Sequence, residues 1–447
     1  AMNAAHAKPK ALIVGLGRSG LSAARYLLAR GWDIVATDSR REPPGRAEIA
    51  SLAPQAAVSC GAFDPSLLDG ASLVVASPGV ALAEPIFAEA AARGIEVVGD
   101  IELFARATSA DVVGITGTNG KSTVTTLLGR MAARAGVDVR VGGNLGTPAL
   151  DLLARQEPQL FVLELSSFQL EATHSLRLRA AAVLNLSADH MDRYADMGAY
   201  AAAKARIFAH CDTAVINADD PYVVSMPRAG QARSAFSLQA HEGVRWHLGE
   251  HAGEMHLMRS GTAVLPVAAM RLCGLHNAAN ALAALALGEA IGLPLDVMLD
   301  ELRDFPGLPH RSQWVAERRG VRYINDSKGT NVGATLAAIA GLPGTLVILA
   351  GGDGKGQDFT PLAAALAGRA RAAVLIGRDA ARIAAVLAGV CAIEQCTTIE
   401  AAVSVAAELA RPGDTVLLSP ACASLDMFRD YAHRGDAFAA AVRSLSA

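Results

Sequence analysis

The sequence has few aromatic side chains and no excess of charge of either sign. Aromatic residues make up 4% of its 447 residues, charged residues make up 19%, and the formal net charge is −3. A chain with so small a net charge is not drawn as a whole toward nucleic acid or anionic lipid, so we expect neither as a partner. No apolar run approaches the ~18 residues of a transmembrane helix, so we predict no membrane span.

Closely spaced cysteine pairs are missing as well. The six cysteines are scattered, and no two of them form a C-x-x-C pair. A chain of this length can bury a core without disulfides, so we expect reduced cysteines in the cytoplasm. The first residues, AMNAAHAKPK, lack the apolar core of a secretion signal, which agrees with a cytoplasmic location.

Aliphatic residues and glycine are abundant. Hydrophobic residues make up 52% of the chain and glycine contributes 42 residues, a composition that suits α/β layers. Short apolar runs alternate with helix-patterned stretches, and the proline- and glycine-punctuated DFPGLPHR separates the last third of the chain. We therefore predict three α/β domains, at residues 1–99, 100–307 and 308–447.

The predicted strands cover residues 10–14, 33–37, 72–76, 95–99, 111–116, 160–165, 181–186, 213–218, 322–326, 345–352, 372–377 and 415–421. Residues 230–270 contain short alternating runs and are expected to form an antiparallel excursion. Residues 276–292 have the spacing of an amphipathic helix.

A first glycine-rich turn lies in IVGLGRSGLSAARYL. Gly15, Gly17 and Gly20 match the G-x-G-x-x-G fingerprint. Asp38 follows at about the distance at which a dinucleotide-binding fold holds its ribose-binding acid. The turn predicts a domain that binds a diphosphate. By itself it favours an NAD-dependent oxidoreductase, which stays open as an alternative.

A second glycine-rich loop, GITGTNGKST, covers residues 114–123. The strict nucleotide-loop pattern fails because Ile115 stands where the pattern needs glycine. Gly117 and Gly120 still allow backbone N–H groups to approach a phosphate, and the following helix adds its dipole. Lys121 can reach the outer phosphates, and the hydroxyl of Ser122 can bind Mg²⁺. A motor or GTPase would need the strict spacing and a base-specificity motif, and neither is present.

Segments along nearly the whole chain resemble one family. GTNGKST resembles the ATP loop of the Mur ligases and folylpolyglutamate synthetases, which form amide bonds and have three domains. The resemblance continues through LELSSFQL, DHMDRY, HNAANALAA, GLPHR, NDSKGTNVGAT, GGDGKGQDF and SPACASLDMF. It implies an α/β chain with a Rossmann-like N-terminal domain, a P-loop-type central ATPase domain and a Rossmann-like C-terminal domain.

The resemblance also implies the reaction. LSSFQL and SPACASLDMF favour the family member that adds D-glutamate to UDP-N-acetylmuramoyl-L-alanine in peptidoglycan precursor synthesis. ATP would convert the carboxylate to an acyl phosphate, which the amine then attacks. Implied cofactors are ATP and Mg²⁺ at two sites, with Mn²⁺ as a substitute, and a carbamylated Lys204. A cytoplasmic monomer is expected, and another Mur-type amino-acid ligase stays open.

Two of the implied site residues also have a reason in the sequence itself. Glu164 ends a predicted buried strand, where a carboxylate needs a cation or a donor and can hold Mg²⁺. His190 follows another predicted strand, at the end where α/β ligand sites form. The resemblance places Ser122, Glu164, His190 and Lys204 at the metals. It makes Lys121, His190, Lys204 and Lys328 catalytic. A protein that had lost catalysis would lack such residues.

The remaining site residues rest on the resemblance. For ATP it implies Gly117, Thr118, Asn119, Gly120, Lys121, Ser122, Thr123, Asn277, Asn280, Arg311 and Asp326. For the UDP-sugar it implies Arg18, Ser19, Asp38, Ser39, Arg40, Gly79 and Asn144. For D-glutamate it implies Thr330, Lys355, Ser424, Leu425 and Tyr431. Helix capping by Asn277 or Asn280 stays an alternative. Gly329 and Tyr431 depart from the family pattern, which has Ala and Phe there.

Lys204→Ala is expected to abolish activity, because the carbamate implied for this lysine would supply oxygen atoms to Mg²⁺. A short-chain carboxylic acid should restore part of the activity by supplying a carboxylate in place of the lost one. ATP-dependent phosphate release measures both effects. Wild-type activity of the variant without added acid would contradict the assignment.

Overall fold

The structure, a computed structural model, describes residues 8–153, 156–186, 190 and 192–446. Its internal packing divides the chain into two compact units. The first unit comprises Ala1–Gly249, Met258–Thr262 and Asn280–Met298, and the second comprises Glu250–Leu257, Ala263–Ala279 and Leu299–Ala447. None of the described helices combines the length and apolar character that crossing a lipid bilayer requires.

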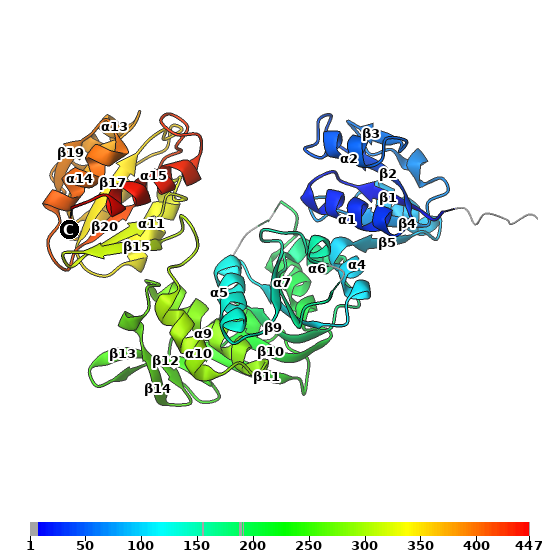
Figure 1. Cartoon of the computed structure of the whole chain (residues 1–447), viewed down its shortest axis with the longest axis horizontal. Coiled ribbons are helices and arrows are strands. Elements are labelled where there is room, and N and C mark those ends of the chain that lie inside the picture. Colours follow the sequence, from blue (N-terminus) through cyan, green and yellow to red (C-terminus); the bar gives the residue numbers. More distant parts are fainter. Residues whose placement is uncertain (1–7, 154–155, 187–189, 191, 447) are drawn as a thin grey trace, which may run out of the picture. The chain divides into compact units, whose positions relative to one another are not determined.

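The N-terminal segment folds around a five-stranded sheet (Figure 1). Its elements are β1 (Lys10–Val14), α1 (Arg18–Ala29), β2 (Asp33–Asp38), α2 (Arg46–Leu52), β3 (Val58–Cys60), η1 (Pro65–Leu68), β4 (Leu73–Ala76), α3 (Pro85–Ala92), β5 (Glu96–Gly99) and α4 (Asp100–Ala107). The strands are parallel in the order β3-β2-β1-β4-β5. Ala11 and Ile13 pack in the same core as α1 and α4, and Leu12 and Val14 pack with α3. Helices therefore cover both faces, which confirms the Rossmann-like prediction.

The middle segment forms a nine-stranded sheet. Its elements are β6 (Asp111–Thr116), α5 (Lys121–Arg134), β7 (Val139–Gly143), η2 (Ala149–Leu152), β8 (Leu160–Glu164), α6 (Ser167–Glu171), β9 (Leu178–Val183), α7 (Met197–Ala205), η3 (Arg206–Phe208), β10 (Cys211–Asn217), α8 (Pro221–Val224), β11 (Ala232–Ser237), β12 (Trp246–His251), β13 (Glu254–Arg259), β14 (Thr262–Pro266), η4 (Val267–Ala269), α9 (Leu275–Ala290) and α10 (Leu295–Asp304). The strand order is β14-β13-β12-β11-β10-β9-β6-β8-β7. The five strands from β10 to β7 in this order are parallel.

The antiparallel excursion predicted for residues 230–270 is wrong in its first part. β11 pairs in parallel with β10 and with β12, so the parallel sheet continues beyond its expected edge. The later part consists of hairpins. Two-residue turns with positive φ, at Ala252–Gly253 and Ser260–Gly261, join β12 to β13 and β13 to β14.

The C-terminal segment forms a six-stranded sheet. Its elements are β15 (Gln313–Arg318), β16 (Val321–Asn325), α11 (Val332–Gly341), β17 (Leu346–Gly351), α12 (Pro361–Leu366), β18 (Ala370–Ile376), α13 (Ala380–Leu387), β19 (Ala392–Gln395), α14 (Ile399–Leu409), β20 (Thr415–Leu418) and α15 (Tyr431–Arg443). The order is β15-β16-β20-β17-β18-β19, and only the edge strand β15 is antiparallel to its neighbour among the described pairs.

The β17 strand shows how this sheet is covered on both faces. Leu346 and Ile348 belong to a core shared with α11, α12 and α13, and Val347 and Leu349 belong to a core shared with α14 and α15. The adjacent strands β16, β20 and β17 are parallel. Their following loops therefore emerge at one edge of the sheet.

The third glycine of the first turn is required by close packing. A Cβ atom at Gly20 would lie 1.9 Å from the carbonyl oxygen of Gly15, so α1 can begin against the turn only if this side chain is absent. A Cβ atom at Gly17 would meet nothing within 4 Å. The same fingerprint thus contains one structural glycine and one that faces open space.

Gly20→Ala is expected to lower the free energy of unfolding by about 1–3 kcal/mol, the usual cost of overpacking, because the turn and α1 must move apart. Gly17→Ala is the matched control and should change stability little. Urea unfolding of both variants measures the difference. An equal loss in the two variants would show that the close approach does not limit stability.

Candidate active site

The phosphate loop joins β6 to α5 and has backbone that favours glycine at both ends. Gly117 and Gly120 have φ of +148° and +87°. Asn185 fixes the loop between them, since its Oδ1 atom accepts from the N–H groups of Thr118 at 3.1 Å and Asn119 at 2.8 Å. The Nδ2 atom of Asn185 donates to the carbonyl of Asn119. The loop is thereby held open at the start of α5, where its dipole favours an anion.

Lys121 and Ser122 begin α5 beside this loop. The Nζ atom of Lys121 donates to the carbonyls of Gly117 at 2.9 Å and Thr118 at 3.1 Å. The hydroxyl of Ser122 donates to Oε2 of Glu164 at 2.7 Å. Lys121 therefore places its cation directly over the phosphate loop.

Glu164 is the last residue of β8 and only 3% exposed. Its Oε1 atom accepts from Nδ2 of Asn144 at 3.0 Å, while Oε2 accepts from Ser122. A buried carboxylate beside a hydroxyl is a hard-oxygen donor set of the kind that Mg²⁺ prefers. The structure thus brings together three predicted site residues, from α5, β8 and the loop after β7.

Lys204 lies near the end of α7 and is 2% exposed. Its Nζ atom donates to the carbonyl of Gly117 at 3.0 Å and to Oγ1 of Thr116 at 3.4 Å. It also lies 4.8 Å from the centre of the Tyr200 ring, whose hydroxyl is 3.2 Å from Oγ1 of Thr118. The lysine that looks solvated in the sequence is therefore buried against the phosphate loop.

His190 is exposed, and its φ of +55° lies in the left-handed region. Its ring stacks edge-on against Phe168, with ring centres 4.8 Å apart, and lies 6.4 Å from the ring of Tyr200. Since Tyr200 reaches both Lys204 and the phosphate loop, the imidazole lies at the rim of the same group.

The two predicted asparagines of α9 occupy different places. A Cβ atom at Gly120 would lie 2.4 Å from Oδ1 of Asn280, so Asn280 packs directly on the phosphate loop. Asn277 donates its Nδ2 to the carbonyl of Cys273 at 2.9 Å. Both residues lie inside α9, which begins at Leu275, so neither occupies the N-cap position.

The predicted UDP-sugar residues other than Asn144 lie in or after the strand-end loops that surround the first glycine-rich turn. Asp38 is 2% exposed, and its carboxylate accepts from Leu16 N and from three nitrogen atoms of Arg40 at 2.7–2.9 Å. Burial alone would raise the pKa of Asp38, but the bonds from Arg40 and Leu16 hold it below its usual value. Ser39 lies between these residues. Gly79 faces open space, like Gly17.

Two side chains link this turn to the rest of the first unit. Arg18 donates to the carbonyl of Gly146, in the loop that carries Asn144. Ser19 is the second, since it acts on the buried carboxylate of Asp100, whose pKa burial raises to about 6.

The D-glutamate candidates lie in the second unit, in loops at one edge of its sheet. Thr330 follows β16, Lys355 follows β17, and Ser424 and Leu425 follow β20, while Tyr431 begins α15. Lys355 has φ of +51°, and its N–H donates to Asp353. Ser424 is buried, and Leu425 is 71% exposed.

Lys328 and Tyr431 approach each other in this region. The Nζ atom of Lys328 lies 5.3 Å from the centre of the Tyr431 ring. The N–H of Lys328 donates to the carbonyl of His310, and that histidine packs edge-on against the same ring. Arg311, next to His310, is exposed, and its charge acts on Asp326.

Asp326 is held at the start of the same loop. Its carboxylate accepts from Ser312 N at 3.0 Å and from the hydroxyl of Ser419 at 2.7 Å. Burial raises the pKa of Asp326 to about 6. A Cβ atom at Gly329 would lie 2.6 Å from that hydroxyl and 2.7 Å from the carboxylate, so the glycine that departs from the family pattern packs tightly here.

Sequence reasoning missed several residues that hold these loops. Arg434 is 1% exposed, donates to the hydroxyl and carbonyl of Ser327 and to the carbonyl of Cys422, and so joins the loops after β16 and β20. Burial lowers its pKa to about 10. Asn185, Tyr200 and His310 were also missed. Their signal in the sequence is weak, since each is a single polar or aromatic residue near a strand or helix end.

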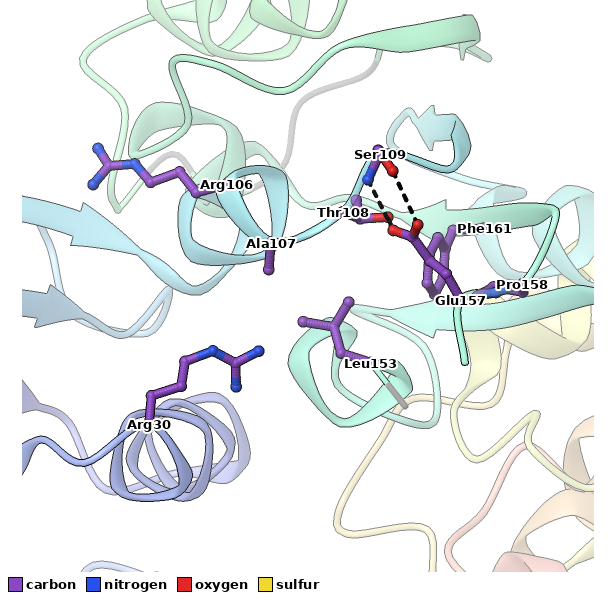
Figure 2. A pocket seen from close by; sticks show the side chains of 9 residues that line it. All are labelled: Arg30, Arg106, Ala107, Thr108, Ser109, Leu153, Glu157, Pro158 and Phe161. Atoms are coloured by element: carbon purple, nitrogen blue, oxygen red, sulfur yellow. Dashed lines mark hydrogen bonds between the residues drawn. The ribbon is translucent and has the colours of Figure 1, made fainter. Parts of the chain in front are cut away.

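A separate cavity of about 420 Å³ in the first unit has none of the predicted site residues among the described residues that line it (Figure 2). Its carboxylate, Glu157, accepts from the N–H of Ser109 at 2.8 Å, from its hydroxyl at 3.0 Å and from Thr108. These bonds secure the segment that leads into β6, so Glu157 has a structural use there.

The phosphate loop lies beside a serine that is bonded to a buried carboxylate, in an α/β chain with three sheets. This arrangement defines a nucleotide-using α/β protein. The chain belongs to the Mur ligase family. Residues 9–99 match the family model described as "Mur ligase MurD-like, N-terminal domain". Residues 115–288 match "Mur ligase middle domain" and residues 310–422 match "Mur ligase, glutamate ligase domain".

Curated relatives share about half of its residues over nearly their whole length. The chain is 54% identical over 436 residues to the UDP-N-acetylmuramoylalanine--D-glutamate ligase of Nitrosococcus oceani, covering 97% of this chain and 96% of that protein. It is 53% identical over 439 residues to the protein of the same name from Methylobacillus flagellatus, with the same coverage.

Solved structures show the same fold. The UDP-N-acetylmuramate-alanine ligase MurC of Thermotoga maritima aligns with a TM-score of 0.56 at 18% identity, covering 98% of this chain and 99% of that one. A UDP-N-acetylmuramoyl-L-alanyl-D-glutamate--2,6-diaminopimelate ligase aligns with a TM-score of 0.59 at 22% identity, covering 78% and 86%.

Asp326→Asn is expected to change how stability depends on pH. Because the folded state holds the proton up to about pH 6 and an unfolded aspartate titrates near 3.9, wild-type stability falls as pH rises between these values. Relative to the variant, the wild type should lose about 2 kcal/mol between pH 4.5 and 6.5, and little more above pH 7.

Urea unfolding at several pH values measures this difference. Asp300→Asn, at a surface position on α10, is the matched control and should not change the pH dependence. A constant difference between the wild type and Asp326→Asn across this range would contradict the assignment.

Proposed function

We propose that the chain joins D-glutamate to UDP-N-acetylmuramoyl-L-alanine and converts ATP to ADP and phosphate, as a step of peptidoglycan precursor synthesis. The relatives named for this ligase, similar over nearly the whole chain, support the substrates. The geometric observation that carries the proposal is the Ser122–Glu164 pair, 2.7 Å apart beside a phosphate loop. The pair supplies oxygen atoms that suit Mg²⁺, and ATP-dependent transfer of a phosphoryl group requires this ion beside the phosphate loop.

In the proposed reaction a carboxylate oxygen of the UDP-sugar attacks the γ-phosphorus of ATP, and ADP leaves. The amine of D-glutamate, after losing a proton, attacks the acyl carbon to form a tetrahedral intermediate, and its nitrogen then loses a second proton to solvent. Collapse of that intermediate breaks the bond to the phosphate and leaves the amide. The enzyme must align both substrates and neutralise charge on the transferred group.

The phosphate loop and Lys121 perform the charge neutralisation. The N–H groups between Gly117 and Ser122 lie at the start of α5, where backbone donors and the helix dipole favour phosphate. The Nζ atom of Lys121 donates to two carbonyls of this loop, so its cation lies beside the place proposed for the outer phosphates. Thr123 continues the same helical turn.

The residues around Glu164 fit Mg²⁺. Ser122 and Glu164 would hold one ion, and His190 and Lys204 would serve the second. When bound, Mg²⁺ withdraws charge from the phosphoryl oxygens. Asn144 donates to the other oxygen of Glu164 and so orients the carboxylate. The resemblance assigns this asparagine to the substrate, near its reacting carboxyl group.

Carbamylation of Lys204 is part of the proposal. The amine adds to carbon dioxide and loses a proton, so a cation becomes an oxygen-bearing anion. The burial of this lysine beneath the phosphate loop supports the assignment, because its contact with the Gly117 carbonyl puts it where an anion could serve the metal.

We assign D-glutamate to the second unit. Two carboxylates need cations or donors, and Lys328 and Lys355 supply two ammonium groups in loops at one edge of its sheet. Thr330 and Ser424 add hydroxyl groups at this edge, and Leu425 and Tyr431 add apolar surface. The hydroxyl of Tyr431 gives this subsite a group that the phenylalanine of the family pattern does not have. The assignments of Arg311, Asp326, Asn277 and Asn280 to ATP rest on the resemblance.

We assign the uridine diphosphate to the first glycine-rich turn. Gly17 and Gly79 face open space, and Arg18 and Ser19 lie within the turn, where a helix start favours a diphosphate. The proposal also includes domains at 1–99, 100–307 and 308–447, a cytoplasmic location and a monomeric state. Light scattering on a sizing column tests the last of these.

Phosphate release with ATP, Mg²⁺, UDP-N-acetylmuramoyl-L-alanine and a panel of amino acids tests the proposed reaction. We expect release with D-glutamate and none with L-glutamate, L-alanine, L-lysine or diaminopimelate. Glu164→Gln should lower the rate at least tenfold, since it removes the buried charge but keeps the shape. Release with a different amino acid would replace the proposed substrate, and reduction of a nicotinamide cofactor would overturn the class of reaction.

A further inference from the structure

Three loops that carry the D-glutamate candidates meet at one glutamine side chain. Gln357 follows β17 in the segment GGDGKGQDF, and its amide contacts residues of all three loops. We propose that Gln357 is a positioning residue that sets the D-glutamate subsite. This inference rests on the proposed function and names a residue that the sequence analysis does not select.

The hydrogen bonds of the Gln357 side-chain amide have a fixed direction. The Oε1 atom of Gln357 accepts from the N–H of Val332 at 2.9 Å. Its Nε2 atom donates to the carbonyls of Gly354 at 2.8 Å and Ala421 at 3.1 Å. Because one end meets a donor and the other meets two acceptors, only the amide in this orientation satisfies all three groups.

Each contacted residue lies close in sequence to a candidate for D-glutamate. Val332 opens α11 two residues after Thr330, and its N–H is one of the donors that a helix start leaves without a helical partner. Gly354 directly precedes Lys355. Ala421 lies three residues before Ser424 and has φ of +58°. A shift of the amide would therefore be transmitted to all three loops.

The loop that carries Lys355 needs this support because its own backbone is unusual. Gly352, Lys355 and Gly356 have φ of +132°, +51° and +74°. Asp379 also holds this loop. Its carboxylate accepts from the N–H of Gly354 at 2.6 Å, and its own N–H donates to the carbonyl of Gly352. Gln357 connects the loop that Asp379 holds to the start of α11.

The substitutions separate shape from hydrogen bonding. Gln357→Met keeps the length of the side chain and removes all three bonds. Gln357→Glu keeps the acceptor for Val332 but places carboxylate oxygen against the carbonyls of Gly354 and Ala421. Gln357→Asn keeps the amide on a side chain one methylene shorter. The matched control is the same series at Gln395, an exposed glutamine at the end of β19.

Steady-state kinetics of the full chain test the inference. We expect the KM for D-glutamate to rise about tenfold in Gln357→Met and further in Gln357→Glu, with the KM for ATP and for the UDP-sugar within twofold of wild type. The Gln395 variants should match wild type. A merely structural role would lower kcat and thermal stability without a selective change in one KM.

Each outcome decides the inference. An unchanged KM for D-glutamate in a folded variant overturns it, as does a parallel rise of all three KM values. If one variant does not fold, the folded members of the series decide. The wild type is first assayed with the amino-acid panel. If it uses another amino acid, the proposed substrate fails, and the KM of that amino acid then decides the role of Gln357. If no amino acid supports turnover, both fail.

Discussion

The buried carboxylate of Glu164 is the constraint on which the phosphate-loop region depends. A carboxylate that is only 3% exposed is costly to bury unless donors surround it. β8 lies between β6 and β7 in the sheet, and the two donors follow these neighbours in the chain, Ser122 after β6 and Asn144 after β7. Satisfying the carboxylate at the end of β8 therefore fixes the start of α5, and with it the geometry of the phosphate loop.

Hydrogen bonds between the loops that follow neighbouring strands also occur in the other two sheets. In the first, β1 lies between β2 and β4. Asp38 at the end of β2 accepts from Leu16, and Ser77 after β4 donates to Gly15. In the third, β20 lies between β16 and β17, and Ser419 after β20 donates to Asp326 after β16. Parallel strands bring their carboxyl ends together, and hydrogen bonds between polar groups then hold the loops that follow these strands.

Much of the fold could be predicted from the sequence because its strands are buried on both faces. Such strands read as continuous apolar runs, and β1, β6 and β17 are examples. The strands β3, β7, β15 and β19 were missed because they are short or half-buried and carry no such run. The parallel pairing of β11 was missed because the alternation of apolar and polar residues indicates a half-exposed strand. It does not indicate whether the neighbouring strand runs parallel or antiparallel.

Some residues of the candidate site could also be predicted from local sequence patterns, and others could not. Lys121 and Glu164 could be found because local sequence patterns mark them. Lys121 follows characteristically spaced glycines, and Glu164 is a charged residue at the end of an apolar run. Lys204 could be found only by resemblance, since its burial depends on how α7 packs on the phosphate loop. Arg434 and Gln357 act by joining loops that are far apart in the chain, and no local pattern marks such a role.

The carboxylate of Asp38 shows why a glycine fingerprint indicates a diphosphate more strongly than it indicates a cofactor. A carboxylate has about four acceptor positions. In this structure Leu16 and Arg40 supply four hydrogen bonds to them. The acid is therefore engaged in holding the turn and the arginine, and it has little capacity left for the ribose hydroxyls that a dinucleotide fold would bind there. The turn itself and the guanidinium of Arg40, oriented by Asp38, therefore form a surface suited to an anion. The glycines require only that a backbone come close to a phosphate, and the chemistry beyond the phosphate depends on side chains such as these.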